Sequence, residues 1–130
     1  MEKILELFSK DKFSHNCGIK VVEIQAGYAK CSMEITENHL NGLGTLMGGA
    51  AFTLADFAFA LAANSHGLAA VSTNANISFL KMCHGGVVTA VASEVSRSHH
   101  LGVYRVILTN DKSEQIVDFT GTCYFKEIQI

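Results

Sequence analysis

Asp56 is the residue of this sequence whose surroundings most favour chemistry. It is the only charged residue in an apolar segment of 18 residues, Leu46 to Ala63. An ionised carboxylate in apolar surroundings loses several kcal/mol of solvation, so it must find a partner or shift its pKa upward. Such carboxylates are frequent at functional sites. A core Asp satisfied by a neighbouring hydroxyl or backbone group is the alternative, and both interpretations stay open here.

Gly48 and Gly49 stand eight and seven residues before Asp56. Glycines are poor helix formers, but at the start of a helix they let a ligand approach the free N–H groups of the first turn. Backbone N–H groups in that position can stabilise an oxyanion. Close packing of the two glycines against a sheet is the competing explanation.

The distance between these two features predicts how they can act together. Eight residues along one helix separate Gly48 from Asp56 by about 12 Å, so one helix cannot aim both at the same carbonyl. If both act on one reacting centre, each comes from a different subunit, with two helices passing each other about a two-fold axis. The active-site hypothesis therefore predicts a homodimer.

The elements that position these residues follow from the hydrophobic pattern. A long helix is expected over Gly48 to Ser65, and a short amphipathic helix over Glu2 to Lys12. Alternating or β-rich runs predict six strands: Gly18 to Ile24, Tyr28 to Thr36, Ala70 to Met82, Val87 to Ser96, Gly102 to Thr109 and Gln115 to Phe125. The long helix is apolar nearly all round, so an antiparallel sheet that curls around it is the economical packing. The sequence predicts an α+β fold.

Composition excludes several classes of partner. With 130 residues, one domain spanning 1–130 is expected. A net charge of −2 without any block of like charges gives no footprint for nucleic acid or for an anionic membrane surface. Asp56 lies in the middle of the one segment long enough to resemble a membrane span, which argues against insertion. The low charged fraction of 17% favours a homo-oligomer.

Cysteine and histidine spacing gives no sign of a metal or redox site. The four cysteines form no CxxC pair, no HExxH motif is present, and no secretory signal is recognised at the N-terminus. His99 and His100 would point to opposite faces if they lay in a strand. The other four histidines fall in predicted turns and are expected to be solvated rather than catalytic: His15, His39, His66 and His84. We expect a cytoplasmic protein with reduced thiols, without a metal and without a cofactor.

The segment Asn41 to Asp56, NGLGTLMGGAAFTLAD, resembles the signature of hotdog-fold acyl-CoA thioesterases of the phenylacetic-acid-degradation (PaaI) type. The segment Ala70 to Leu80 is similar to the family's strand after the helix, and Val95 to His100 matches the turn that contacts coenzyme A. The resemblance extends over about residues 18 to 125. It implies a hotdog fold, an acyl-CoA or aryl-acyl-CoA substrate, and a dimer or dimer of dimers.

The resemblance also implies roles for four catalytic residues. Asp56 would act as nucleophile or as general base for water, and Gly48 N–H would polarise the thioester carbonyl across the dimer interface. Asn41 would orient the thioester or the water from its loop. Ser72 would help to hold the water near Asp56.

Substrate-binding positions are implied in the same way. They fall beside the glycine pair, at the end of the strand after the helix, and in the later turn. These positions are Met47, Gly49, Phe79, Leu80, Lys81, Ser96, Arg97, Ser98, His99 and His100. The cations among them would meet the phosphates of coenzyme A. Ordinary solvated strand ends are the alternative for Lys81, His99 and His100, as they are for Arg97.

One position departs from the family pattern. The family usually has His immediately before the two glycines, whereas this chain has Met47, which donates no hydrogen bond. A slower thioesterase is one consequence. A non-catalytic acyl-CoA-binding or regulatory protein is the other, and an oligomeric structural protein without a ligand is a third hypothesis.

Overall fold

The computed structural model describes residues 1–130 and contains helices and strands in an α+β arrangement, as expected. The helices are α1 (Glu2–Phe8), α2 (Lys12–Asn16) and α3 (Gly48–Asn64), with a 3-10 turn η1 at Glu37–His39. The strands are β1 (Ile19–Gln25), β2 (Tyr28–Glu34), β3 (Leu68–Phe79), β4 (Val87–Arg97), β5 (Leu101–Thr109) and β6 (Gln115–Gln129). All six predicted strands and the long helix are present, with ends that differ from the predicted ones by a few residues.

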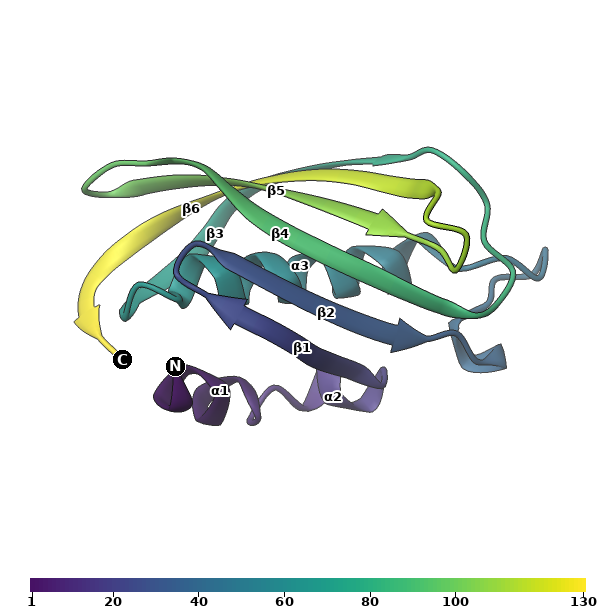
Figure 1. Ribbon diagram of the computed structural model, residues 1–130, viewed down its shortest axis with the longest axis horizontal. Helices are drawn as coiled ribbons and strands as arrows, with labels where there is room; N and C mark the ends of the chain where they lie inside the picture. Colours follow the sequence, from purple (N-terminus) through teal and green to yellow (C-terminus); the bar gives the residue numbers. More distant parts are fainter.

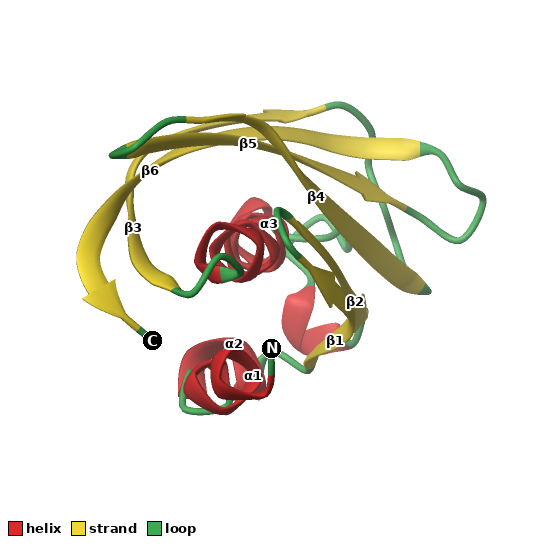
Figure 2. Ribbon diagram, turned by 60° about the vertical axis from the view of Figure 1, so that its left-hand side comes forward, coloured by secondary structure: helices red, strands yellow, loops and turns green.

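A single antiparallel sheet curls around α3, which confirms the packing that the sequence predicted. The strand order is β1-β2-β4-β5-β6-β3, and every neighbouring pair is antiparallel. Figure 1 shows α3 running across the concave face of the sheet, and Figure 2 shows the sheet bending over it. The strand β3 leaves the end of α3 and joins the far edge beside β6, so β1 and β3 are the two edges of the sheet.

Helix α3 supplies much of the core because most of its circumference is apolar. Ten of its 17 residues are buried. A half-buried stripe remains at helical spacing, formed by Phe52, Thr53, Asp56 and Ala60. The sheet therefore encloses α3 incompletely, and the stripe that stays open contains its one carboxylate.

The strand β2 illustrates how the rest of the core is built. Ala29, Cys31 and Met33 are fully buried, whereas the residues between them are partly accessible. This alternation confirms that β2 turns one face to α3 and the other toward solvent.

No helix of the structure combines the length and the hydropathy needed to cross a bilayer.

The prediction of one N-terminal helix over Glu2 to Lys12 was wrong. The helix stops at Phe8, and a second one begins after Asp11, whose side chain accepts hydrogen bonds from Ser14 N (3.0 Å) and Ser14 Oγ (2.8 Å). An Asp at the N-cap stabilises a new helix start, and this local preference overrides the continuing apolar spacing. Both short helices lie on the same side of the molecule, under β1 and α3 (Figure 2).

A β-bulge in β3 changes which of its side chains face α3. Ser72 pairs with the buried Cys123, and the register shifts between Ser72 and Asn74. Beyond the shift, Phe79 pairs with the buried Val117. Directly paired residues share a face, so Ser72 and Phe79 both lie on the concave face although strict alternation would separate them.

Gly121 allows α3 to approach the sheet closely. A Cβ atom added there would lie 2.8 Å from Cε2 of Phe59 on α3, and 3.0 Å from a ring carbon of Phe119. Both rings are fully buried and have no space to move into. The helix-to-sheet distance at this point therefore depends on the missing side chain.

We expect Gly121→Ala to lower the free energy of unfolding by about 1–3 kcal/mol, because it overpacks the contact with Phe59. Urea unfolding followed by circular dichroism measures the change. Gly85→Ala is the matched control, since a Cβ at Gly85 meets nothing within 4 Å and its backbone needs no positive φ. Equal stability of the two variants would contradict this explanation of the close approach.

Candidate active site

The loop before α3 is folded around the side chain of Asn41. Its Oδ1 accepts hydrogen bonds from the backbone N–H of Leu43 (3.0 Å), the backbone N–H of Thr45 (3.1 Å) and Thr45 Oγ1 (3.2 Å). An Asn that bonds its own following backbone forms a turn of this kind. These bonds use only the carbonyl oxygen, so the amide Nδ2 remains as a donor for another group.

His39 holds this loop against the rest of the chain. Its Nε2–H donates to Cys17 O (2.7 Å), its Nδ1 accepts from Thr36 N (2.9 Å), and its backbone carbonyl accepts from Met47 N (2.8 Å). The ring is buried, so the prediction that His39 lies solvated in a turn was wrong. Both ring nitrogens are used in hydrogen bonds that hold the chain segment leading into α3 in place.

The first N–H groups of α3 are available to a ligand. Leu46 N and Met47 N are bonded to Cys83 O (2.7 Å) and His39 O (2.8 Å), and the bonds of the first helical turn begin at Ala50 N. Gly48 and Gly49 lie between them at the first two helical positions, where N–H groups have no partner within the helix. The positive end of the helix dipole adds to their attraction for negative charge.

Asn41 and Gly48 line one cavity, together with three of the predicted substrate-binding residues. The cavity has a volume of about 370 Å³. Its walls include Phe79, Leu80 and Lys81 at the end of β3. The structure thus brings together five residues that the sequence placed in the site, at the N-terminal end of α3.

Asp56 is not part of this cavity in the single chain. It lies eight residues further along α3, about 12 Å from Gly48, on the half-buried stripe. Burial, and after it the negative charge of Asp11, raises the pKa of Asp56 above its ordinary value. A carboxyl group with a raised pKa is better matched to accepting a proton near neutral pH.

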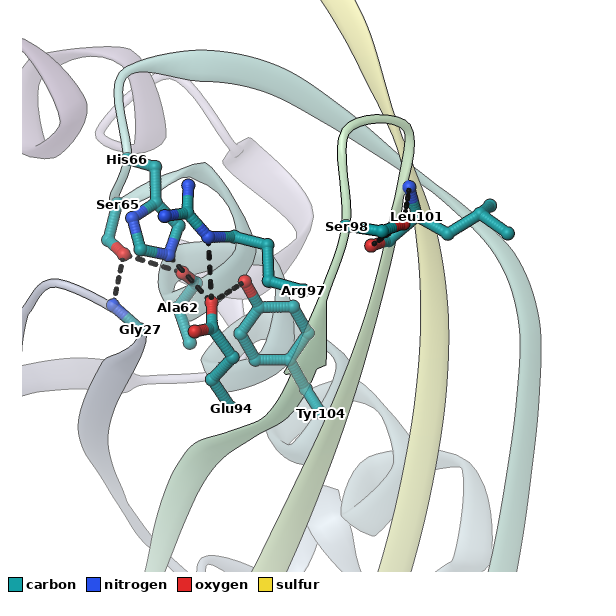
Figure 3. Close-up of polar contacts among 9 residues, drawn as sticks. All are labelled: Gly27, Ala62, Ser65, His66, Glu94, Arg97, Ser98, Leu101 and Tyr104. Carbon is teal, nitrogen blue, oxygen red and sulfur yellow. Dashed lines mark hydrogen bonds and ion pairs between the residues drawn. The ribbon is translucent and has the colours of Figure 1, made fainter.

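The remaining predicted residues lie apart from the cavity. Ser72 lies on the concave face of β3, and the exposed residues Met47 and Gly49 lie just before and at the start of α3. Ser96, Arg97, Ser98, His99 and His100 occupy the end of β4 and the turn that follows. Arg97 of this group lies near His66, just after the C-terminal end of α3, because both side chains contact Glu94 (Figure 3). Helix α3 is about 25 Å long, so Arg97 lies at the opposite end of it from Gly48.

Figure 3 shows how the C-terminal end of α3 is fastened to β4 and β5. Glu94 Oε1 accepts hydrogen bonds from Tyr104 Oη (2.7 Å) and His66 Nε2 (2.6 Å), and Arg97 Nε lies 3.8 Å away. Next to this network, Ser65 Oγ accepts from Gly27 N (2.7 Å). The expectation that His66 is merely solvated was therefore wrong.

Local contacts decide where two predicted substrate-binding side chains point. Arg97 turns its guanidinium toward Glu94 and His66, whereas Ser98 closes the hairpin turn with Leu101 (Figure 3). Burial raises the pKa of the Glu94 carboxyl group, but the hydrogen bonds from Tyr104 and His66 and the nearby positive charge together outweigh it, so the pKa is lowered. His99 and His100 are exposed at the turn, and the His100 ring stacks on Tyr124.

Several residues of the cavity were absent from the sequence predictions. Thr45 donates to Asn41 twice, and the spacing of these two residues in a glycine-rich loop was the signal that could have indicated it. Ile116 and Val117 come from β6 and reach the cavity because β6 pairs with β3. No local pattern predicts that pairing. Lys81, which lines the cavity, pairs with Glu114.

Comparison with known proteins identifies the family. A family model described as the thioesterase superfamily matches residues 43–117, which is more than half of the chain. The chain belongs to the thioesterase superfamily. This thioesterase-superfamily chain is 34% identical over 116 residues to the acyl-coenzyme A thioesterase PaaI of Escherichia coli, with 88% of the chain and 83% of that protein covered.

Solved structures of thioesterase relatives share the fold. The structure of the Escherichia coli PaaI protein from the phenylacetic acid degradation operon superposes with a TM-score of 0.92 at 32% identity, and 96% of this chain and 91% of that one are covered. The phenylacetic acid degradation protein PaaI of Thermus thermophilus gives 0.83 at 34% identity, with 86% and 96% covered. The sheet wrapped around a central helix is the hotdog fold that the sequence resemblance implied.

The Glu94 network predicts a pH-dependent contribution to stability. Because the folded state lowers the pKa of Glu94, the charged carboxylate stabilises the fold above the pKa of the unfolded chain, which is about 4.3. This contribution is lost as the pH falls from there through the lower pKa of the folded state. We expect Glu94→Gln to be less stable than the wild type at pH 7, with a difference that narrows toward pH 3. Denaturant unfolding at a series of pH values measures it.

Glu127→Gln is the control for this series, since its side chain is 84% exposed and faces only His99 at 3.9 Å. An exposed pair at that distance contributes little. A difference between wild type and Glu94→Gln that stays constant from pH 7 to pH 3 would refute a role for the charge.

Proposed function

We propose that the protein hydrolyses the thioester bond of an acyl-coenzyme A, releasing a carboxylic acid and free coenzyme A. The observation that carries the proposal is that Asn41 and Gly48 line one cavity, while Asp56 lies about 12 Å from Gly48 on the same helix. The acyl-coenzyme A thioesterase activity named for the Escherichia coli relative supports this choice of substrate.

The reaction needs three functions that these residues can supply. The Gly48 N–H stabilises the negative charge that develops on the thioester oxygen. Asn41 Nδ2, left free by the bonds of its carbonyl oxygen, orients the thioester or the attacking water. In one route Asp56 takes a proton from a water molecule, which attacks the carbonyl carbon. In the other route the Asp56 carboxylate attacks that carbon itself to form an anhydride, and water then hydrolyses the anhydride to the free acid and restores the carboxylate. In both routes the carbon–sulfur bond breaks and the coenzyme A thiolate takes up a proton. Ser72 helps to hold the water.

We propose that the site is completed across a two-fold axis, because Gly48 and Asp56 of one chain are too far apart to reach one carbonyl. Two surfaces that the single chain leaves uncovered support such a dimer. The outer edge of the 12-residue strand β3 has no hydrogen-bonded neighbour, and Val71 to Asn76 are exposed along it. Long open edges of this kind are normally covered by another chain or element. The Asp56 stripe of α3 is the second surface.

An antiparallel arrangement of two α3 helices also accounts for the two groups of substrate-binding residues. In one chain, Phe79 to Lys81 lie at the N-terminal end of α3 and Ser96 to His100 at the other. A two-fold axis places opposite ends of the two helices side by side. Arg97, His99 and His100 would then bind the phosphates of a coenzyme A whose thioester lies at the Gly48 of the partner. A further dimer of dimers, and a cytoplasmic location, stay predictions.

Met47 is the reason to consider a non-catalytic acyl-coenzyme A-binding protein as the alternative function. Its side chain is exposed at the N-cap of α3 and makes no capping hydrogen bond, so it cannot take the place of the family's His as a donor. A chain that depended on that donor would bind acyl-coenzyme A without turning it over. The intact oxyanion N–H and the carboxylate with its raised pKa favour the enzyme over the binding protein.

We expect the purified protein to release free thiol from a panel of acyl-coenzyme A esters, and Asp56→Ala to reduce kcat by about 100-fold or more, as expected for loss of a general base or nucleophile. The measurement is thiol release with a chromogenic disulfide. Asp118→Ala is the control, because Asp118 is a half-buried carboxylate on β6 that pairs with Arg105 outside the site.

Absence of hydrolysis by the wild type, with the esters still bound, would favour the non-catalytic alternative. In that case a gain of turnover in Met47→His would identify the missing donor as the cause. Full activity of Asp56→Ala would reject Asp56 as the reacting carboxylate.

The charge of Asp11 predicts a shift in the pH profile. Asp11 raises the pKa of Asp56, so Asp11→Asn lowers that pKa and moves the acidic limb of the kcat/KM profile to lower pH. Asn caps a helix about as well as Asp, so the fold and α2 are expected to be retained. Asp111→Asn, which removes an exposed carboxylate from a loop outside the site, is expected to leave the limb unchanged. An unshifted limb in Asp11→Asn would exclude this influence on Asp56.

A further inference from the structure

Phe79 packs directly against the residue that carries the oxyanion N–H. A Cβ atom added to Gly48 would lie 3.2 Å from Cζ and 3.4 Å from Cε1 of the Phe79 ring. The ring therefore covers the position that a side chain would take at the first residue of α3. It reaches this point because the bulge in β3 turns Phe79 toward the helix, opposite Val117.

Most of the residues that line the cavity beside this contact are apolar, among them Leu46, Ala51, Leu80 and Ile116. The other lining residues are Asn41, Thr45, Gly48 and Lys81, and Lys81 is already paired with Glu114. A thioester held by the Asn41 amide and the Gly48 N–H has two sides, and the side that enters this cavity meets mostly apolar side chains. An acyl chain fits that environment, whereas the amide-rich arm of coenzyme A would lose hydrogen bonds there.

The size of the cavity limits what it can hold. Its volume of about 370 Å³ lies at the low end of the range, roughly 300–1,000 Å³, that small-molecule pockets span. Ile116 and Val117, which close it from β6, are almost completely buried and cannot move aside. Phe79 differs from them because 57% of it is exposed, so its ring is the wall that substitution can remove without opening the core.

We propose that this cavity binds the acyl group and that Phe79 is the specificity-determining residue that restricts it to compact acyl groups, such as a short aliphatic chain or a single-ring aryl group. This inference rests on the proposed thioesterase function. Phe79 sets the depth of the cavity beside Gly48. A longer chain meets the ring before its carbonyl oxygen reaches the Gly48 N–H.

The test compares Phe79→Ala and Phe79→Leu with the wild type on acetyl-, butyryl-, phenylacetyl-, octanoyl- and dodecanoyl-coenzyme A. The wild type is expected to prefer the compact members. In Phe79→Ala the ratio of kcat/KM for octanoyl- to that for butyryl-coenzyme A is expected to rise by about tenfold or more, since even one methylene group in an apolar pocket discriminates by that much. Phe79→Leu, which keeps a bulky side chain, should give a smaller rise in the same direction.

Phe13→Ala is the matched control, because Phe13 is a 70% exposed aromatic residue on α2 that does not line the cavity. Equal loss of activity on every ester in both Phe79 variants, or an unchanged order of preference, would overturn the proposal. Dissociation constants for the same esters test the role of Phe79 independently of whether the protein hydrolyses them. A wild type that hydrolyses none of them contradicts the function, while a shift in binding preference toward longer chains still supports the role of Phe79.

Discussion

The need to bury α3 determines most of this structure. The helix is apolar on nearly every side, and ten of its 17 residues are removed from water. A flat sheet covers only one side of a helix, so the six strands must curve, and the missing side chain of Gly121 lets the helix approach. The Glu94 network and the loop around His39 then fix the two ends of α3. Each end carries a group of the proposed site.

The same helix imposes the geometry of catalysis. Its first turn presents the N–H of Gly48, and two turns later it presents Asp56 from the stripe that the sheet leaves open. A rigid helix keeps these groups about 12 Å apart. In the proposed dimer, a second copy of the helix runs in the opposite direction and brings Gly48 of one chain close to Asp56 of the other. The proposal gives the incomplete burial of α3 and the open edge of β3 one explanation, because the second copy would cover both.

Local patterns were sufficient to predict α3, the six strands, and the cluster of Asn41, Gly48 and the end of β3. A lone carboxylate in an apolar run, a glycine pair and alternating strands are all signals within about 20 residues. The break after Phe8 was missed because the N-cap preference of Asp11 outweighs a continuing apolar spacing. The roles of His39 and His66 depend on partners 22 and 28 residues away, which no local pattern contains. For the same reason, neither the pairing of β3 with β6 nor the bulge that turns Phe79 inward could be predicted.

The claim that most needs a direct test is that each site takes Asn41 and Gly48 from one chain and Asp56 from the other. Coexpression of Asp56→Ala and Asn41→Ala chains in equal amounts provides it, because each homodimer has only damaged sites and each heterodimer has one intact site. Random pairing makes half of the dimers mixed, so about a quarter of the wild-type activity should return in a two-fold dimer. Activity no higher than that of the separate variants would show that all three residues act within one chain.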